Sequence, residues 1–295
     1  MKDYVAENQR ILDKWRNDYV KRNKENWPGC FNLHEYFAPD GIMFKGEFRG
    51  EERYFKKEKE NEETFSRVFR WVRIPSGEEN ALWANAPLRI LFLTKDQNTG
   101  ENPAWDVRSE TFRYLSDEYK PEELWIDSSR GNFFKNLVFL FYGLMNTKVD
   151  KKIDYHQINE KDALSYIDDE EHIFARINCK KEVGGAKCPN NVLANAIYDN
   201  NNKDFLKQQI LNLDADIFVC CGLMSFMPNL LNDMGYHFEP QDDDKWIYYD
   251  MEENKNKLAI NSYHLSLPGF KYEGLISAYH EFLKNHPDFI KSHRK

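Results

Sequence analysis

Cysteine is scarce in this chain of 295 residues, and the few cysteines form no recognisable framework. There are five, an odd number, and they lie apart from one another except for the adjacent Cys220 and Cys221. No Cys-x-x-Cys pair occurs, which speaks against a structural zinc or iron–sulfur site. A scattered, odd set also speaks against a disulfide framework and favours a reducing compartment.

Long apolar runs and glycine-rich nucleotide loops are missing too. The longest near-continuous apolar stretch, Leu137 to Met145, is too short to cross a bilayer, and the first residues lack the apolar segment of a signal peptide. We therefore expect a cytoplasmic protein with no membrane attachment. Neither a Walker-type loop nor a G-x-G-x-x-G pattern occurs, and we expect no cofactor and no bound metal.

Positive charge is in deficit. The chain has 41 lysines and arginines against 49 aspartates and glutamates, a formal net charge of −8. A surface that binds a polyanion over its whole extent would normally carry the opposite balance, but a local basic cleft is compatible with it. The sequence contains one small basic patch, formed by Lys180, Lys181 and Lys187 with Arg176. A patch of this kind is often only a solvent-exposed face.

Apolar and aromatic residues make up 41% and 15% of the chain, which is enough for a large core and excludes global disorder. Four short apolar runs, separated by helical patterns, predict buried strands. They are Leu88–Leu93, Ile173–Ile177, Asp216–Gly222 and Lys257–Asn261. Strands that alternate with helices predict a parallel sheet covered on both faces.

We therefore predict an α/β fold: a three-layer α/β/α domain over residues 86–295, with a central, mostly parallel four-stranded sheet. Residues 1–85 are expected to form a helical or irregular extension packed on this core. Val5, Leu12 and Tyr19 recur at seven-residue spacing, which predicts a helix before Trp27-Pro28-Gly29. From Cys30 to Arg73 the chain reads as irregular, and only Glu60–Val72 shows enough pattern to suggest an element.

Polar residues follow the predicted strands, at the edge of the sheet where sites form in such folds. Asp96 could cap the next helix, or it could orient water and offset a developing cation. Asn178 could bond the backbone of a turn, or its amide could hydrogen-bond the edge of a base.

The last predicted strand leads into a polar turn, and an aromatic side chain lies on an earlier loop. His264 could be a structural or surface histidine or a catalytic one. Ser266 could be an ordinary turn serine or could hold a phosphate. Trp105 could fill the core or stack on a base.

The order of these motifs resembles the uracil-DNA glycosylase superfamily over about Leu88 to Phe282. Thr94-Lys95-Asp96-Gln97-Asn98 resembles that family's Gly-Gln-Asp-Pro-Tyr, and Ile177-Asn178-Cys179-Lys180-Lys181 resembles Thr-Asn-Val-Val-Lys-Cys. Tyr263-His264-Leu265-Ser266 is similar to its His-Pro-Ser loop. The family's leading Gly and the Pro after the acid are missing, Leu265 replaces the Pro of the last motif, and the four iron–sulfur cysteines of some branches are absent.

The resemblance implies an enzyme that removes uracil, or a bulkier modified pyrimidine, from DNA and leaves an abasic site. The base would first flip out of the stack. The implied roles are base stacking for Trp105, base reading for Asn178, hydrogen-bond donation to the base for His264, and water alignment for Asp96. Lys180, Lys181, Leu265 and Ser266 would contact the DNA, Leu265 as a wedge in the stack and Ser266 on a phosphate.

The implied partner is DNA, single- or double-stranded, and the protein is expected to be a monomer. Two other functions fit the same residues. One is a nucleotide or nucleic-acid sensor that binds in the same cleft without catalysis. The other is a hydrolase or deoxyribosyltransferase-like enzyme that acts on free nucleosides and ignores polymeric DNA.

Overall fold

The structure of the protein is a computed structural model. It describes residues 2–24, 33–59, 62–97, 99, 103–113, 115, 126, 131–184, 188–223, 226–250, 252, 256–267 and 270–293. Among the helices in these ranges, none combines the length and the apolar character that a bilayer crossing requires.

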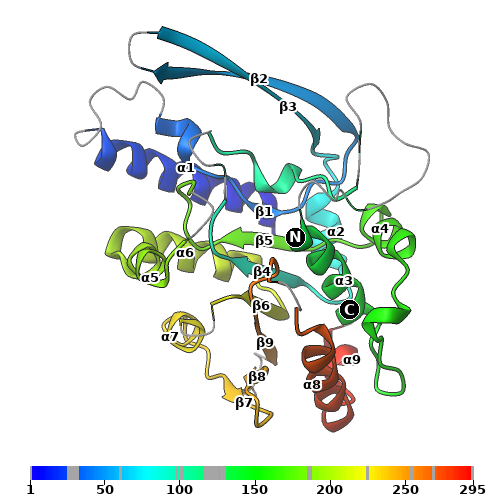
Figure 1. Ribbon diagram of the computed structural model, residues 1–295. Coiled ribbons are helices and arrows are strands. Elements are labelled where there is room, and N and C mark those ends of the chain that lie inside the picture. The colour runs from blue at the N-terminus through cyan, green and yellow to red at the C-terminus, as the bar shows by residue number, and fades with distance from the viewer. Residues whose placement is uncertain are drawn as a thin grey trace.

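A mixed, mostly parallel sheet forms the centre of the molecule (Figure 1). Its four middle strands run parallel in the order β5-β4-β6-β9. They are β5 (Ala175–Asn178), β4 (Ile90–Thr94), β6 (Ile217–Cys221) and β9 (Lys257–Ser262). All four predicted strands are therefore confirmed as neighbours in one sheet.

The predicted count of four strands is too low, because the sheet has seven. The additional strands are β1 (Gly41–Ile42), β7 (Glu239–Pro240) and β8 (Ile247–Asp250). They pair antiparallel at the two edges, β1 with β5 and β8 with β9, and β7 pairs with β8. Strands of two to four residues are too short to show an apolar period, so their pairing depends on tertiary contacts that no local pattern displays.

Alternate residues of the parallel strands enter two separate cores, as the period of two requires. Ile90 and Phe92 of β4 pack with helices on one side of the sheet, whereas Leu91 and Leu93 pack with helices on the other. The first set of helices is α3 (Asn132–Asn146), α4 (Glu160–Asp168), α8 (Tyr272–Asn285) and α9 (Phe289–His293). The second is α1 (Tyr4–Asn23), α2 (Glu79–Asn85), α5 (Asn190–Tyr198), α6 (Asn200–Leu213) and α7 (Met227–Asn232).

Side-chain caps set where three of these helices begin. Asp3 accepts the N–H of Ala6 at 2.9 Å, which satisfies one of the free donors in the first turn of α1. Asn159 does the same at the start of α4, and Asp199 at the start of α6. The described residues also contain the short 3-10 helices η1 (Leu33–Tyr36), η2 (Val107–Ser109) and η4 (Tyr155–Gln157).

The N-terminal region contains more regular structure than its sequence predicts. The expected first helix is confirmed as α1, and it packs against α6, where the rings of Trp15 and Phe205 stack at 5.8 Å. The stretch from Cys30 to Arg73 contains an antiparallel ribbon of β2 (Phe48–Lys59) and β3 (Glu62–Arg73), which lies apart from the central sheet (Figure 1). The element suggested at Glu60–Val72 corresponds to β3, whereas β2 was expected to be irregular. Charged and aromatic residues occur on both sides of this ribbon, so its sequence lacks the alternation that marks a half-buried strand.

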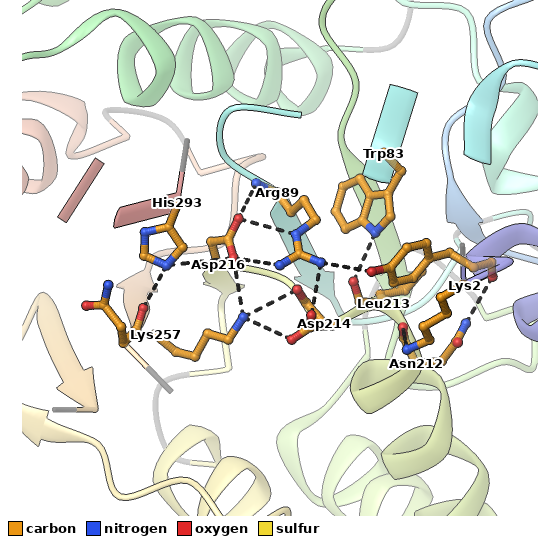
Figure 2. Close-up of polar contacts among 11 residues, drawn as sticks. Lys2, Trp83, Arg89, Asn212, Leu213, Asp214, Asp216, Lys257 and His293 are labelled. Atoms are coloured by element: carbon orange, nitrogen blue, oxygen red, sulfur yellow. Dashed lines mark hydrogen bonds and ion pairs between the residues drawn. The ribbon is translucent and has the colours of Figure 1, made fainter. Parts of the chain in front are cut away.

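Ion pairs connect the amino-terminal ends of β4, β6 and β9 (Figure 2). Asp216, which is 2% exposed, lies 3.0 Å from a guanidinium nitrogen of Arg89 and 3.3 Å from the ammonium nitrogen of Lys257. Asp214 pairs with the same two cations, at 2.9 and 3.0 Å. The candidate functional residues lie at the opposite, carboxyl-terminal ends of the strands.

Candidate functional site

Asp96, Asn178 and His264 all lie at one edge of the sheet, namely the end at which its parallel strands finish. Asp96 follows β4, Asn178 is the last residue of β5, and His264 follows β9. Adjacent strands are about 4.8 Å apart. Since β5 and β4 are neighbours and β9 is two strands beyond β4, three strand spacings, about 14 Å, separate the strand ends that carry Asn178 and His264.

The carboxylate of Asp96 is held close to the loop that follows β5. Its Oδ2 atom lies 3.6 Å from Nζ of Lys180, and its side chain is 10% exposed. A Cβ atom on Gly184 would lie only 2.3 Å from the same oxygen, so the glycine is needed for the close approach of this loop. The backbone N–H of Gly184 donates to the carbonyl of Gln97 at 2.9 Å, which fixes the two loops together.

Asn178 is fully buried, and its backbone and side chain are positioned by different partners. Its N–H donates to the carboxylate of Asp40 at 2.8 Å, and its Oδ1 accepts the hydroxyl of Thr94 at 2.6 Å. Among the described residues, the Nδ2 group has no hydrogen-bond partner. A buried donor left without a partner costs free energy, so this amide is available to a ligand that brings an acceptor.

Arg176 lies two residues before Asn178 and therefore on the same face of β5. Its side chain is buried, and the guanidinium lies 4.7 Å from the centre of the Phe133 ring. Nε donates to the hydroxyl of Thr94 at 3.4 Å, and Nη1 has no partner in the part of the chain that the structure describes. Burial lowers the pKa of Arg176, and no carboxylate of the described residues lies within 4.0 Å of its guanidinium.

His264 is positioned by the turn that it begins. Its Nδ1 accepts the backbone N–H of Ser266 at 3.3 Å and lies 2.6 Å from the serine hydroxyl. An Nδ1 that accepts a backbone N–H carries no proton, so the neutral ring has its proton on Nε2. Burial lowers the pKa of His264, and the nearby positive charge of Lys95 lowers it further.

Phe133, near the start of α3, connects the two ends of the site. Its ring lies 5.9 Å from the ring of His264 and also covers the guanidinium of Arg176. Asp96 and Arg176 both act electrostatically on His264. A continuous chain of contacts therefore crosses the edge, with Asp96 nearby. It runs from Asn178 through Thr94, Arg176 and Phe133 to His264.

Two residues expected to contact DNA are in the protein interior. Lys181 is 2% exposed, pairs with the buried carboxylate of Asp40 and donates to the carbonyl of Asn178 at 3.0 Å. Leu265 is fully buried in the core beneath α3. Neither can reach a DNA strand from these positions, so we remove both from the expected DNA-binding set. The reason is that Lys181 neutralises a buried acid and Leu265 fills the core below the His264 turn.

The other expected contacts are also engaged within the protein. Trp105 is 6% exposed, and the guanidinium carbons of Arg53 and Arg70 lie 4.2 and 4.6 Å from its ring centre. It is therefore not open to a base, and the aromatic ring among the site residues is that of Phe133. Lys180 turns toward Asp96, whereas Ser266 is exposed and orients His264.

Sequence reasoning placed Arg176 only in a basic patch and missed Thr94, Phe133 and Asp40 as site components. Thr94 and Arg176 did carry a signal. Each is a polar residue on a short apolar strand, and Arg176 shares the period-two face of Asn178. The role of Asp40 could not be predicted from the sequence, because it depends on a hydrogen bond from Asn178, which is 138 positions away.

The described residues contain no group of three or more histidine, cysteine, aspartate or glutamate side chains that could hold a metal ion. A cavity of about 540 Å³ lies between the Gln241–Ile247 segment and α8 and includes none of the candidate residues. Its carboxylates include Asp242, which accepts the backbone N–H groups of Trp246 and Ile247 and so stabilises a turn. The chemistry of that cavity is therefore unrelated to the edge that carries Asp96.

The edge formed by Asp96, Asn178, Arg176 and His264 combines a carboxylate, an imidazole and two buried donors, Nδ2 of Asn178 and Nη1 of Arg176, that have no hydrogen-bond partner among the described residues. These groups can bind a polar heterocycle and stabilise opposite charges on its two sides. A comparison with models of known protein families found no match to the chain, and a search of curated proteins found none either.

Proposed function

We propose that the protein is a DNA glycosylase that hydrolyses the N-glycosidic bond of a flipped uracil or modified pyrimidine and leaves an abasic site. The observation that carries the proposal is the arrangement of Asp96, Asn178 and His264 at the ends of three strands of one sheet. Helices on both faces of the sheet fit the three-layer α/β/α arrangement that the resemblance implies. The proposal includes a cytoplasmic monomer whose partner is DNA.

Cleavage of this bond develops positive charge on the sugar and negative charge on the base. Asp96 is suited to offset the first and to align the attacking water. His264 is suited to stabilise the second, because its neutral ring donates through Nε2. The free Nδ2 of Asn178 supplies a second donor, for an oxygen on the edge of the base.

Cations near this edge support an approach of DNA despite the negative net charge of the chain. Lys95 and Lys180 flank Asp96, and Arg53 of the β2–β3 ribbon lies beside Trp105. Local positive charge of this kind raises the rate of encounter with a polyanion and makes binding sensitive to salt.

The test is an excision assay on DNA that carries a panel of modified pyrimidines, single- and double-stranded, read out as alkali-labile sites and released base. We expect excision by the wild-type protein and none by Asp96→Asn. Asp288→Asn removes a carboxylate that is 84% exposed and serves as the matched control with unchanged activity. Absence of alkali-labile sites with every base would reject the glycosylase proposal.

Two companion measurements, binding of the same DNA or of nucleotides and incubation with free nucleosides, would identify the alternative functions. Tight binding of the DNA or of a nucleotide, with no abasic product, would point to a sensor. Release of bases from free nucleosides, with indifference to polymeric DNA, would point to a nucleoside hydrolase or transferase.

A further inference from the structure

Arg176 has an unusual environment for a guanidinium. It is 5% exposed, yet the described residues offer it no ion pair within 4.0 Å. Its contacts are the hydroxyl of Thr94 and the face of the Phe133 ring. A buried charge without a partner destabilises a folded protein, so a position that keeps one calls for an explanation outside the fold itself.

The second unpaired donor of the site lies on the same face of the same strand. Nη1 of Arg176 and Nδ2 of Asn178 are both buried, and both lack a hydrogen-bond partner in the described ranges of the chain. Thr94 contacts both side chains, which places the two groups around one hydroxyl. Two free donors, one of them cationic, are matched by a ligand with adjacent acceptor atoms and negative charge.

We propose that Arg176 binds the departing base in its anionic form and, with Asn178, selects bases whose buried edge carries oxygen acceptors. This inference rests on the proposed function, because it assigns the charge that Arg176 neutralises to the base that leaves. Phe133 is half-buried over the guanidinium, so its ring is the side chain that must rotate when a base enters.

The chemical step balances without any further reactant. The bond between the sugar carbon and the base nitrogen breaks, and its electron pair leaves on the base. Water then adds its oxygen to the sugar carbon, and the proton that it gives up neutralises the released base. Arg176 keeps its proton throughout and acts only as a hydrogen-bond donor and a positive charge.

The experiment measures the binding of two free bases, uracil and 5-fluorouracil, by calorimetry at one mildly alkaline pH. Fluorine makes the ring more acidic and changes its size little. We expect the wild-type protein to bind 5-fluorouracil more tightly than uracil. In Arg176→Gln this preference should vanish, and 5-fluorouracil binding should weaken about ten- to hundredfold.

A second readout separates this role from a structural one. The carboxylates of Glu110 and Asp40 act on Arg176 only from beyond the ion-pair distance of 4.0 Å among the described residues, so they offset its burial in part, and Arg176→Gln should unfold at a higher urea concentration than the wild type. A residue kept for stability would shift the midpoint the other way. Arg49→Gln makes the same chemical change at a side chain that is 63% exposed, and should alter neither binding nor stability.

Equal binding of the two bases by the wild type, no binding of either, or an unchanged preference in Arg176→Gln would overturn the inference. Inorganic phosphate that binds at Arg176 in place of the bases would also overturn it, since the arginine would then be a contact for the DNA backbone. The proposed function fails separately. Acidity-dependent base binding without excision from DNA would reject the glycosylase and leave the role of Arg176 in base binding intact.

Discussion

Asp40 and Asn178 are 138 positions apart in the sequence, yet the buried carboxylate of Asp40 accepts the backbone N–H of Asn178 at 2.8 Å. The same carboxylate pairs with Lys181 and accepts the side chain of Gln209 at 2.7 Å. Asp40 also lies one residue before β1, which pairs with β5. The N-terminal region is therefore part of the support of the site, and the end of β5 depends on it.

Asp40→Asn should destabilise the protein strongly. The substitution keeps the size of the side chain but leaves the ammonium of Lys181 buried without its counter-ion. We expect the free energy of unfolding to fall by about 3–5 kcal/mol, the usual cost of breaking a buried pair from one side. Urea unfolding followed by tryptophan fluorescence measures it. Asp13→Asn, at a carboxylate that is 44% exposed, is the control and should change the free energy of unfolding little. A similarly small change in Asp40→Asn would contradict the role assigned to Asp40.

Gly184→Ala should move Asp96 while the protein stays folded. The new Cβ would lie 2.3 Å from Oδ2 of Asp96, so the carboxylate or the loop must shift. Displacement of a catalytic group by about 1 Å can cost about a hundredfold in rate. We expect base release to slow by about that factor, measured as single-turnover excision.

Gly274→Ala provides the control for that experiment. Its Cβ would meet Trp246 at 3.7 Å, an ordinary van der Waals distance, and the position lies within α8, outside the candidate site. This variant should excise at the wild-type rate. If Gly184→Ala did the same, the position of Asp96 would not matter for the reaction.

His264 should remain neutral to a lower pH than a free histidine. Burial and the charge of Lys95 lower its pKa below the ordinary 6.5. Stability from the neutral ring is therefore fully present above pH 6.5 and is lost as the pH falls through the pKa of the folded state. Nitrogen NMR on labelled histidine should show a proton on Nε2 at neutral pH and a titration midpoint under 6.5. A midpoint above 6.5, or a proton on Nδ1, would contradict the hydrogen bond from Ser266.

The parts of the fold that the sequence predicted are those with a strong local pattern. The four middle strands are apolar runs bounded by polar residues, and α1 repeats its apolar residues at helical spacing. In the ribbon of β2 and β3, only the position of β3 was suggested by the sequence, because the ribbon is stabilised by pairing along its length and by contacts such as Arg70 with Trp105. Such contacts leave no period in the sequence.

The candidate site divides in the same way. Strand ends predicted the location of Asp96, Asn178 and His264, because parallel strands present their carboxyl ends at one edge. Burial was not predictable for Lys181 and Leu265, since both follow polar site residues and look like loop residues in the sequence. Whether a lysine faces solvent or a buried acid is decided by a partner far away in the chain.

Asp216→Asn should lower stability without changing the chemistry, because Asp216 directly precedes β6, whereas the candidate residues lie where the parallel strands end. Figure 2 shows the ion pairs of Asp216. It is 2% exposed and is the carboxylate between Arg89 and Lys257, so its loss leaves two largely buried cations with one acid fewer. We expect the free energy of unfolding to fall by about 3–5 kcal/mol. Asp214→Asn removes a carboxylate that has the same two partners but is 44% exposed, and the free energy of unfolding should fall by about 1 kcal/mol or less.

Excision per folded molecule should be unchanged in both variants, measured at a temperature where circular dichroism shows them folded. Slower excision by folded Asp216→Asn would mean that the two edges of the sheet are coupled and that the edge with the candidate site is not an independent unit.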